Sequence, residues 1–146
     1  MDTKEFTTLL TQELLKIIKN KNSSYSYYLY NGFDKKDDLT DQEILDRLVL
    51  NADGVPMELM RDYFLYGDKK TIYTDKGTIK LEEYIGDEKD IETYVQRVLS
   101  ITNSNHTDYF SCEGYYSSWN GIDWEGSHFV KVKPREKTII EYVPEL

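Results

Sequence analysis

Apolar residues near the start of the chain recur at intervals of three and four residues, which is the spacing of one face of a helix. Asp2 and Glu5 precede them with the separation of a capping box, in which each side chain accepts a hydrogen bond from the other residue's backbone. We therefore predict a helix over Thr3–Lys19 that faces a core. Its apolar stripe consists of Phe6, Leu9, Leu10, Leu14, Ile17 and Ile18.

Two shorter helices are predicted in the middle of the chain, across a tight turn. Thr40 and Glu43 form a second capping box, and the helix that follows is expected to run to about Leu50. Pro56 stands at the favoured first position of the next helix, which extends to Gly67. Such a pair is also the outline of a helix-turn-helix DNA reader. The second helix carries more acidic than basic residues, however, so plain helix packing is the preferred interpretation.

The next segments predict a hairpin and a third helix. Thr71–Thr74 and Thr78–Leu81 flank a turn at Asp75-Lys76-Gly77. After an acidic connector over Glu82–Asp90, apolar residues again fall on one helical face. These residues are Ile91, Tyr94, Val95, Val98 and Leu99. An earlier run, Tyr25–Tyr30, fits either a strand or an aromatic surface loop, and the strand is preferred.

The last third of the chain, Tyr109–Val143, is rich in aromatic and β-branched residues that alternate with period two. Turn residues at Asn120-Gly121, Gly126-Ser127 and Pro134 divide it, which predicts a three-stranded antiparallel meander. In its first strand one face carries Tyr109, Ser111, Glu113, Tyr115, Ser117 and Trp119, and the other carries Phe110, Cys112, Gly114, Tyr116 and Ser118. We predict a single α+β domain over residues 1–146, with N-terminal and central helices and a short hairpin packed on the C-terminal meander.

Composition narrows the functional classes. The net charge is −9. Sequence-independent binding of nucleic acid requires an excess of lysine and arginine, so we expect no direct nucleic-acid partner. The 13 tyrosines suit a protein interface, because tyrosine combines a flat apolar ring with a hydroxyl group. The single cysteine, Cys112, fits a reducing cytoplasm. Neither a secretory signal nor a membrane span is predicted.

Residues that would carry catalysis or metal binding are few. His106, Cys112 and His128 are the only soft ligands, and their spacing matches no zinc site. Cys112 and a histidine would make a nucleophilic pair, but a position in a regular strand is typical of a small buried thiol. The sequence has no phosphate-binding loop, dinucleotide-binding glycine run or serine elbow. We expect no enzyme, no cofactor and no metal site, although the many carboxylates leave acid–base catalysis open.

Charge is distributed unevenly along the chain. Residues 34–62 contain nine acidic and four basic residues, and residues 82–92 contain six acidic residues and one lysine. The C-terminal segment instead carries a basic stripe of Lys131, Lys133, Arg135 and Lys137. Such runs are often no more than solvated faces, and lysines on an edge strand discourage aggregation. The alternative interpretation is a dipolar protein whose acidic regions bind a basic partner.

Three parts of the C-terminal third resemble the ends of small uncharacterised proteins of phages and mobile elements. They are the Gly-Tyr-Tyr run at Gly114–Tyr116, the Trp-Asn-Gly-Ile-Asp-Trp turn at Trp119–Trp124 and the Val-Lys-Pro-Arg-Glu-Lys junction at Val132–Lys137. In small size, acidity and absence of cofactor motifs, the chain is similar to anti-CRISPR and related counter-defence proteins. This resemblance implies an inhibitor of a defence complex and assigns a role to no individual residue.

These observations lead to one functional hypothesis. The chain is expected to be a non-enzymatic inhibitor, in the manner of anti-CRISPR proteins, that binds a bacterial nuclease or defence complex in the host cytoplasm. Its carboxylates would occupy a lysine- and arginine-lined channel in place of phosphates, and tyrosines would fill the contact. The carboxylates predicted to bind are Asp37, Asp38, Asp41, Glu82, Glu83, Asp87 and Glu88. The alternatives are a helix-turn-helix DNA-binding regulator and a small enzyme that acts on a defence component.

The segment Trp119–Trp124 supplies one further candidate. Asn120-Gly121 favours a tight turn, which brings the two indoles close together. Trp119 continues the strand alternation and is predicted to be buried, whereas Trp124 lies between two acidic residues. We therefore predict that Trp124 is an exposed anchor for a partner, and that its replacement by alanine weakens binding with little loss of stability.

Overall fold

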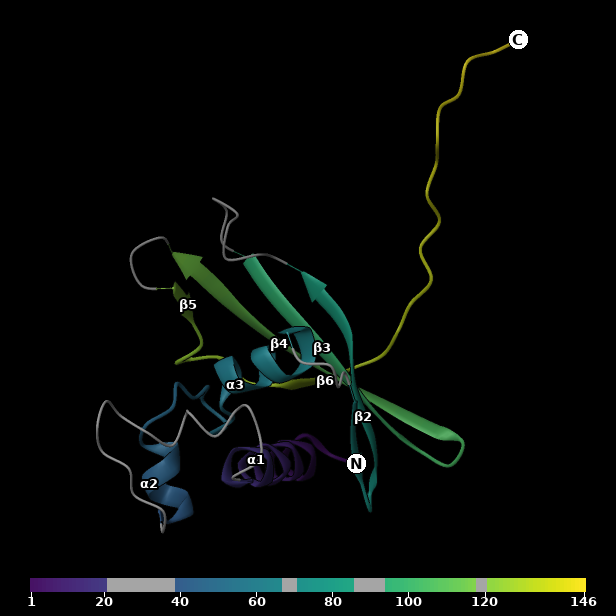
Figure 1. Cartoon of the computed structure of the whole chain (residues 1–146). Coiled ribbons are helices and arrows are strands. Elements are labelled where there is room, and N and C mark those ends of the chain that lie inside the picture. The colour runs from purple at the N-terminus through teal and green to yellow at the C-terminus, as the bar shows by residue number, and fades with distance from the viewer. Residues whose placement is uncertain (21–38, 67–70, 86–93, 118–120) are drawn as a thin grey trace.

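The computed structural model describes residues 1–20, 39–66, 71–85, 94–117 and 121–146 (Figure 1). The helices in these ranges are α1 (Thr3–Lys19), α2 (Asp41–Leu45) and α3 (Met57–Arg61), and a π-helical turn (Asp62–Tyr66) directly follows α3. The strands are β1 (Thr71–Thr74), β2 (Gly77–Ile85), β3 (Tyr94–Asn103), β4 (His106–Ser117), β5 (Gly121–Asp123) and β6 (Val130–Val132). The predicted Tyr25–Tyr30 element lies outside the described residues.

The strands form one antiparallel sheet in the order β1-β2-β3-β4-β5, and β6 also pairs with β4. The sheet is curled into a half-barrel, and α1 lies along one of its faces (Figure 1). The predicted architecture of helices and a hairpin packed on a three-stranded meander is therefore wrong. The hairpin and the segment predicted as a third helix belong to the same sheet as the C-terminal strands.

The largest difference concerns Tyr94–Asn103, which forms the central strand β3 rather than a helix. Val95, Leu99 and Ile101 lie on the inner face of the sheet, toward the core, with the period-two alternation of a strand. Arg97 occupies the inner position between Val95 and Leu99 and is only 1% exposed. A charged residue at a buried position breaks the apolar alternation in the sequence, and the remaining apolar residues then match helical spacing.

The hairpin predicted around Asp75-Lys76-Gly77 is confirmed as β1 and β2. β2 is longer than predicted and continues to Ile85, so that Glu82 and Glu83 belong to a strand and not to a connector. A bulge after Leu81 shifts the register of β2 against β3. Bulges increase the local bend of a strand, which agrees with the curl of the sheet.

The starts of α1 and α2 agree with the predicted capping boxes, whereas the ends of the two short helices differ from the prediction. α1 covers the predicted residues, with the Asp2–Glu5 capping box in place. α2 begins with the predicted Thr40–Glu43 box but ends at Leu45, well before the predicted end. Pro56 is the N-cap of α3, one residue before the first helical position that was predicted for it, and the α-helix has five residues and ends at Arg61, before the predicted end at Gly67.

The core lies between α1 and the inner face of the sheet. The ring of Phe6 on α1 stacks on that of Phe110 on β4, with the ring centroids 4.1 Å apart. Phe129 meets Phe6 edge-on at 5.7 Å. These three rings join the first helix, a central strand and the segment before β6, and they fix the position of that segment beneath the sheet.

The two-sided pattern predicted for β4 is confirmed. Phe110 and Cys112 are buried on the inner face, whereas Glu113 and Tyr115 are exposed on the outer face, which is turned away from α1. The predicted last strand is not formed. β6 ends at Val132, and residues 133–146 are exposed and have no strand or helix.

Candidate functional site

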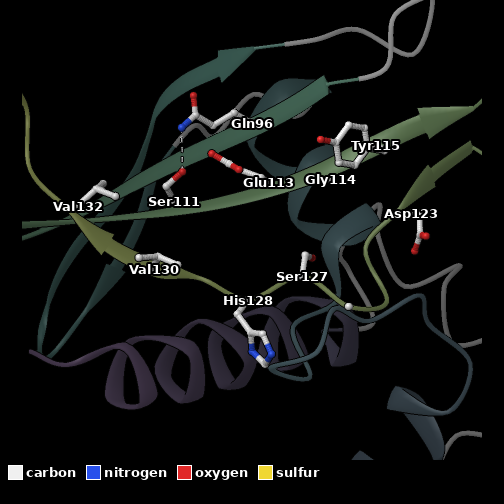
Figure 2. A pocket seen from close by; sticks show the side chains of 11 residues that line it. Gln96, Ser111, Glu113, Gly114, Tyr115, Asp123, Ser127, His128, Val130 and Val132 are labelled. Atoms are coloured by element: carbon white, nitrogen blue, oxygen red, sulfur yellow. Dashed lines mark hydrogen bonds between the residues drawn. The ribbon is translucent and has the colours of Figure 1, made fainter.

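A pocket of about 580 Å³ opens at the edge of the sheet where β5 and β6 approach β4 (Figure 2). β5 pairs with Tyr115–Ser117 and β6 pairs with Tyr109–Ser111, so both short strands lie along the edge of β4 that β3 leaves free. The chain between them leaves the sheet, and the part of β4 between these two registers pairs with neither strand. The pocket, named here the β4 pocket, lies over this gap.

The outer face of the sheet forms one side of the β4 pocket. Gln96 of β3 donates a hydrogen bond from Nε2 to the Ser111 hydroxyl oxygen at 3.0 Å (Figure 2). The Glu113 carboxylate accepts a hydrogen bond from the Tyr94 hydroxyl at 2.7 Å. Tyr115 follows on the same face and is 65% exposed. An exposed carboxylate therefore lies beside exposed aromatic rings at the mouth of the pocket.

The segment between β5 and β6 forms the opposite side. The Asp53 carboxylate accepts a hydrogen bond from the Phe129 backbone N–H at 2.7 Å, and its other oxygen lies 2.9 Å from Nδ1 of His128. The backbone N–H of Ala52 donates to the carbonyl of Ser127 at 2.9 Å. These bonds attach the segment to the loop before α3, and they hold the wall of the pocket in place from outside the sheet.

The chemistry of the β4 pocket suits a cation with an aliphatic stem. Glu113 and Asp123 are exposed carboxylates, and Val130 and Val132 add apolar surface. None of the described residues that line the pocket is a lysine or an arginine. A lysine or arginine side chain can lay its stem on apolar surface while its head meets carboxylates, and the ring of Tyr115 offers a cation–π contact.

Trp124 is 4% exposed, so the prediction of an exposed anchor is wrong. Its ring lies against Gly114, and a Cβ added at Gly114 would lie 2.8 Å from the indole. The guanidinium carbon of Arg97 lies 5.9 Å from the centroid of the ring. The neighbouring acidic residues Asp123 and Glu125 are exposed while the indole of Trp124 is buried in the core, so the charge of the neighbouring residues does not report the exposure of Trp124.

The cysteine and the histidines do not form a nucleophilic pair. Cys112 is buried, and its Sγ lies 3.6 Å from Nδ2 of Asn51 and 3.5 Å from the hydroxyl oxygen of Ser127. His106 bonds the Asp108 carboxylate at 2.8 Å, and His128 bonds Asp53. Burial raises the pKa of the Cys112 thiol, although its hydrogen bonds with Ser127 and Asn51 act in the opposite direction.

We expect Cys112 to react slowly with thiol reagents in the folded protein, because the thiolate is the reactive form and its pKa is raised by burial. The native protein and the protein unfolded in guanidinium chloride are compared at one pH with Ellman's reagent. The expected native rate is lower by at least about a hundredfold, as the low population of opened molecules implies. Equal rates in the two states would contradict the burial of the thiol.

The carboxylates predicted from the sequence are not gathered in the β4 pocket. Asp41 is the first residue of α2 and pairs with Lys19 of α1. Glu82 is exposed on β2 and accepts a hydrogen bond from the Ser100 hydroxyl at 2.7 Å. The backbone of Glu83 pairs with Val98 of β3. The predicted carboxylates outside the described residues are Asp37, Asp38, Asp87 and Glu88, and Trp119 is outside them as well.

The sequence contained a signal for the residues that were missed. The alternation of the first C-terminal strand placed Glu113 and Tyr115 on one face, opposite the buried Phe110 and Cys112. A carboxylate and a tyrosine on the solvent side of a strand are candidates for binding. The local density of acidic residues is high over residues 34–62 and 82–92, whereas Glu113 lies in a segment of low charge density.

No cluster of three metal-ligating side chains occurs in the ranges that the structure describes. Within the same ranges, no helix has the length and apolar character needed to cross a membrane. Comparisons with models of protein families, with curated proteins and with solved structures find no match for this chain.

Proposed function

We propose that this protein is a non-enzymatic binding protein that inhibits a nucleic-acid-handling partner by occupying its basic surface. The observation that carries the proposal is the β4 pocket, in which the carboxylates of Glu113 and Asp123 lie beside the exposed ring of Tyr115. A protein that binds nucleic acid presents lysine and arginine side chains for phosphates. Such side chains also match a pocket with carboxylates and an aromatic ring.

Long-range charge supports the same proposal. The chain carries a net charge of −9, which draws a basic surface toward it and raises the rate of association. Contacts that exclude water then determine how long the complex lasts, and exposed tyrosines are suited to such contacts. The partner class proposed is a CRISPR nuclease of a bacterial host cell, with inhibition in the cytoplasm. The predicted partner-binding carboxylates Asp37, Asp38, Asp41, Glu82, Glu83, Asp87 and Glu88 stay part of the proposal, as contacts outside the β4 pocket.

The proposal is tested by titrating the protein against a panel of CRISPR nucleases and measuring DNA cleavage. A stoichiometric inhibitor saturates near one copy per nuclease, whereas an enzyme acting on the nuclease is effective far below that ratio. Inhibition of no member of the panel, or inhibition by catalytic amounts, would count against a binding protein of this kind.

The double variant Glu113→Lys, Asp123→Lys is expected to weaken inhibition at least about tenfold, because it places two cations where the partner's cations bind. The matched control is Asp75→Lys, Glu58→Lys, which makes the same change in net charge at two exposed residues outside the pocket. If both double variants lose inhibition equally, net charge alone accounts for binding. If neither loses it, the pocket is not the binding site.

A further inference from the structure

The segment 133–146, named here the tail, is exposed along its whole length. It begins where β6 ends and extends away from the body of the protein (Figure 1). It also contains large apolar side chains, each of which is at least 74% exposed. These residues are Ile139, Ile140, Tyr142, Val143 and Leu146. Apolar residues grouped in this way mark a segment that is covered in an assembled state.

The tail has the sequence character of a strand that adds to another surface. Its apolar part, Thr138–Val143, consists of β-branched and aromatic residues with one glutamate. Its first part is basic, because Lys133, Arg135 and Lys137 outnumber Glu136. Residues 133–137 thus carry +2, and since the whole chain carries −9, the remaining residues together carry −11. A second copy of this chain is therefore an electrostatically complementary partner for this basic first part of the tail, although the whole tail carries no net charge.

The β4 pocket matches the tail in both respects. Its carboxylates, Glu113 and Asp123, face no lysine or arginine among the described residues that line it. Beside them, Tyr115 and Val130 are each more than half exposed and form the apolar rim. Lys131, which precedes the tail, is already engaged, because its ammonium lies 3.4 Å from the Asp108 carboxylate. The basic residues of the tail itself are the ones available to reach the pocket of a second copy.

We propose that two copies of this chain form a symmetric dimer in which each tail occupies the β4 pocket of the other copy. The basic part of the tail binds Glu113 and Asp123, and its apolar part covers Tyr115 and Val130. The inference rests on the cation-binding role proposed for the same pocket. The proposed dimer adds the tail of a second copy as an occupant of the pocket. Because dimerisation depends on protein concentration, the access of another partner to the pocket depends on it as well.

The place where the tail begins favours this arrangement. Val132 lines the β4 pocket, and the tail follows it directly, so donor and acceptor lie on one patch of the surface. A two-fold axis near this patch brings both tails to both pockets at once and closes the assembly. The other end of the sheet, strand β1, is far from this patch in the strand order, and a tail bound there would build open chains. Residues 133–143 span about 36 Å when extended, which is ample for the exchange.

The test is sedimentation of the protein alone, over a wide range of concentrations and at two salt concentrations. The full chain is expected to be a dimer that weakens with salt, and a chain ending at Val132 is expected to be a monomer. Two reversal variants are made, one with Lys133→Glu, Arg135→Glu, Lys137→Glu in the tail and one with Glu113→Lys, Asp123→Lys in the pocket. Each alone is expected to dimerise at least about tenfold more weakly than the full chain. Their mixture is expected to regain association, since each tail then matches the other copy's pocket.

A monomeric full chain at every concentration overturns the proposal, and so does a dimer that persists in the chain ending at Val132. Failure of the two reversal variants to associate with each other, when the full chain dimerises, overturns the assignment of the pocket as the acceptor. Circular dichroism checks the fold of each variant, and the tail variants keep the test decisive if the pocket variant does not fold. No nuclease is present in these measurements, so their failure is distinct from a failure of the proposed inhibition.

Discussion

Replacing Trp124 with alanine is expected to lower the free energy of unfolding by about 3 to 5 kcal/mol, the usual cost of removing a large buried aromatic side chain. The indole is 4% exposed, lies against the backbone of Gly114 and stands beside the buried Arg97 guanidinium. Its loss leaves a cavity between β4 and the segment after β5, and it leaves Arg97 without its aromatic neighbour. Urea unfolding followed by circular dichroism measures the change.

Two further variants define the origin of this cost. Tyr73→Ala removes an aromatic side chain that is 81% exposed and is expected to change stability by no more than about 0.5 kcal/mol. Gly114→Ala leaves the indole in place but puts a methyl group within 2.8 Å of it, and we expect a loss of about 1 to 3 kcal/mol from overpacking. If Trp124→Ala costs no more than Tyr73→Ala does, the indole is not part of the core, and a surface role for it returns.

The sequence predicted those elements whose local signals agree with their tertiary environment. α1 has an apolar stripe, a capping box and basic residues in its last turn, and all three point to the same boundaries. In β4 likewise, every inner position from Phe110 to Gly114 is apolar or small. An element can be predicted from a single sequence when its local residue pattern agrees with the burial of its side chains in the fold.

β3 shows why the sheet as a whole was not predicted. Its inner face carries Arg97, and its outer face carries Val98 and Ser100, both of which are buried. Burial on both sides removes the simple alternation of apolar and polar residues that identifies a strand. The period that remained was that of a helix. β3 pairs with β2 on one side and with β4 on the other. Because β3 was predicted as a helix, the hairpin before it and the strands after it were predicted as separate structures instead of one sheet.

The candidate site depends on contacts between residues that are far apart along the chain. The wall of the β4 pocket is held by Asp53, which bonds residues 128 and 129 across a sequence separation of 75 and 76 residues. No local pattern contains such a pairing. Glu113 and Tyr115 were assigned to the correct face from the alternation alone, but their neighbours in space, Asp123 and Val130, follow from the path of the chain after β5.

The second large effect is expected at Asn51, whose side chain organises the loop that carries Asp53. Asn51 is 5% exposed, and its Oδ1 accepts hydrogen bonds from the backbone N–H groups of Asp53 at 2.9 Å and Val55 at 3.0 Å. Gly54, between them, has a φ of +82°, which favours glycine and closes the turn. The side chain of Asn51 thus replaces a backbone acceptor inside a tight turn.

Asn51→Ala removes the acceptor for two backbone N–H groups, and each buried group left without a partner costs about 1 to 3 kcal/mol. We therefore expect the free energy of unfolding to fall by about 2 to 4 kcal/mol, since Val55 is buried and Asp53 partly so. The matched control is Asn103→Ala at an exposed position of the β3–β4 hairpin, which is expected to cost no more than about 0.5 kcal/mol. Urea unfolding of both variants gives the comparison.

A second measurement on the same variant separates loss of the loop from loss of global stability. Asn51 Nδ2 lies 3.6 Å from the Cys112 sulfur, so the asparagine also covers the thiol. If the loop opens, Cys112 in Asn51→Ala reacts faster with Ellman's reagent than in the unchanged protein, under conditions where the variant is still folded. The control is Phe6→Ala, a destabilised variant with an intact loop. At equal stability, Cys112 in Phe6→Ala is not expected to react faster in this way. A rate equal in the two variants would mean that the thiol is reached only by global unfolding, and that the turn at Asn51 holds its place without the side chain.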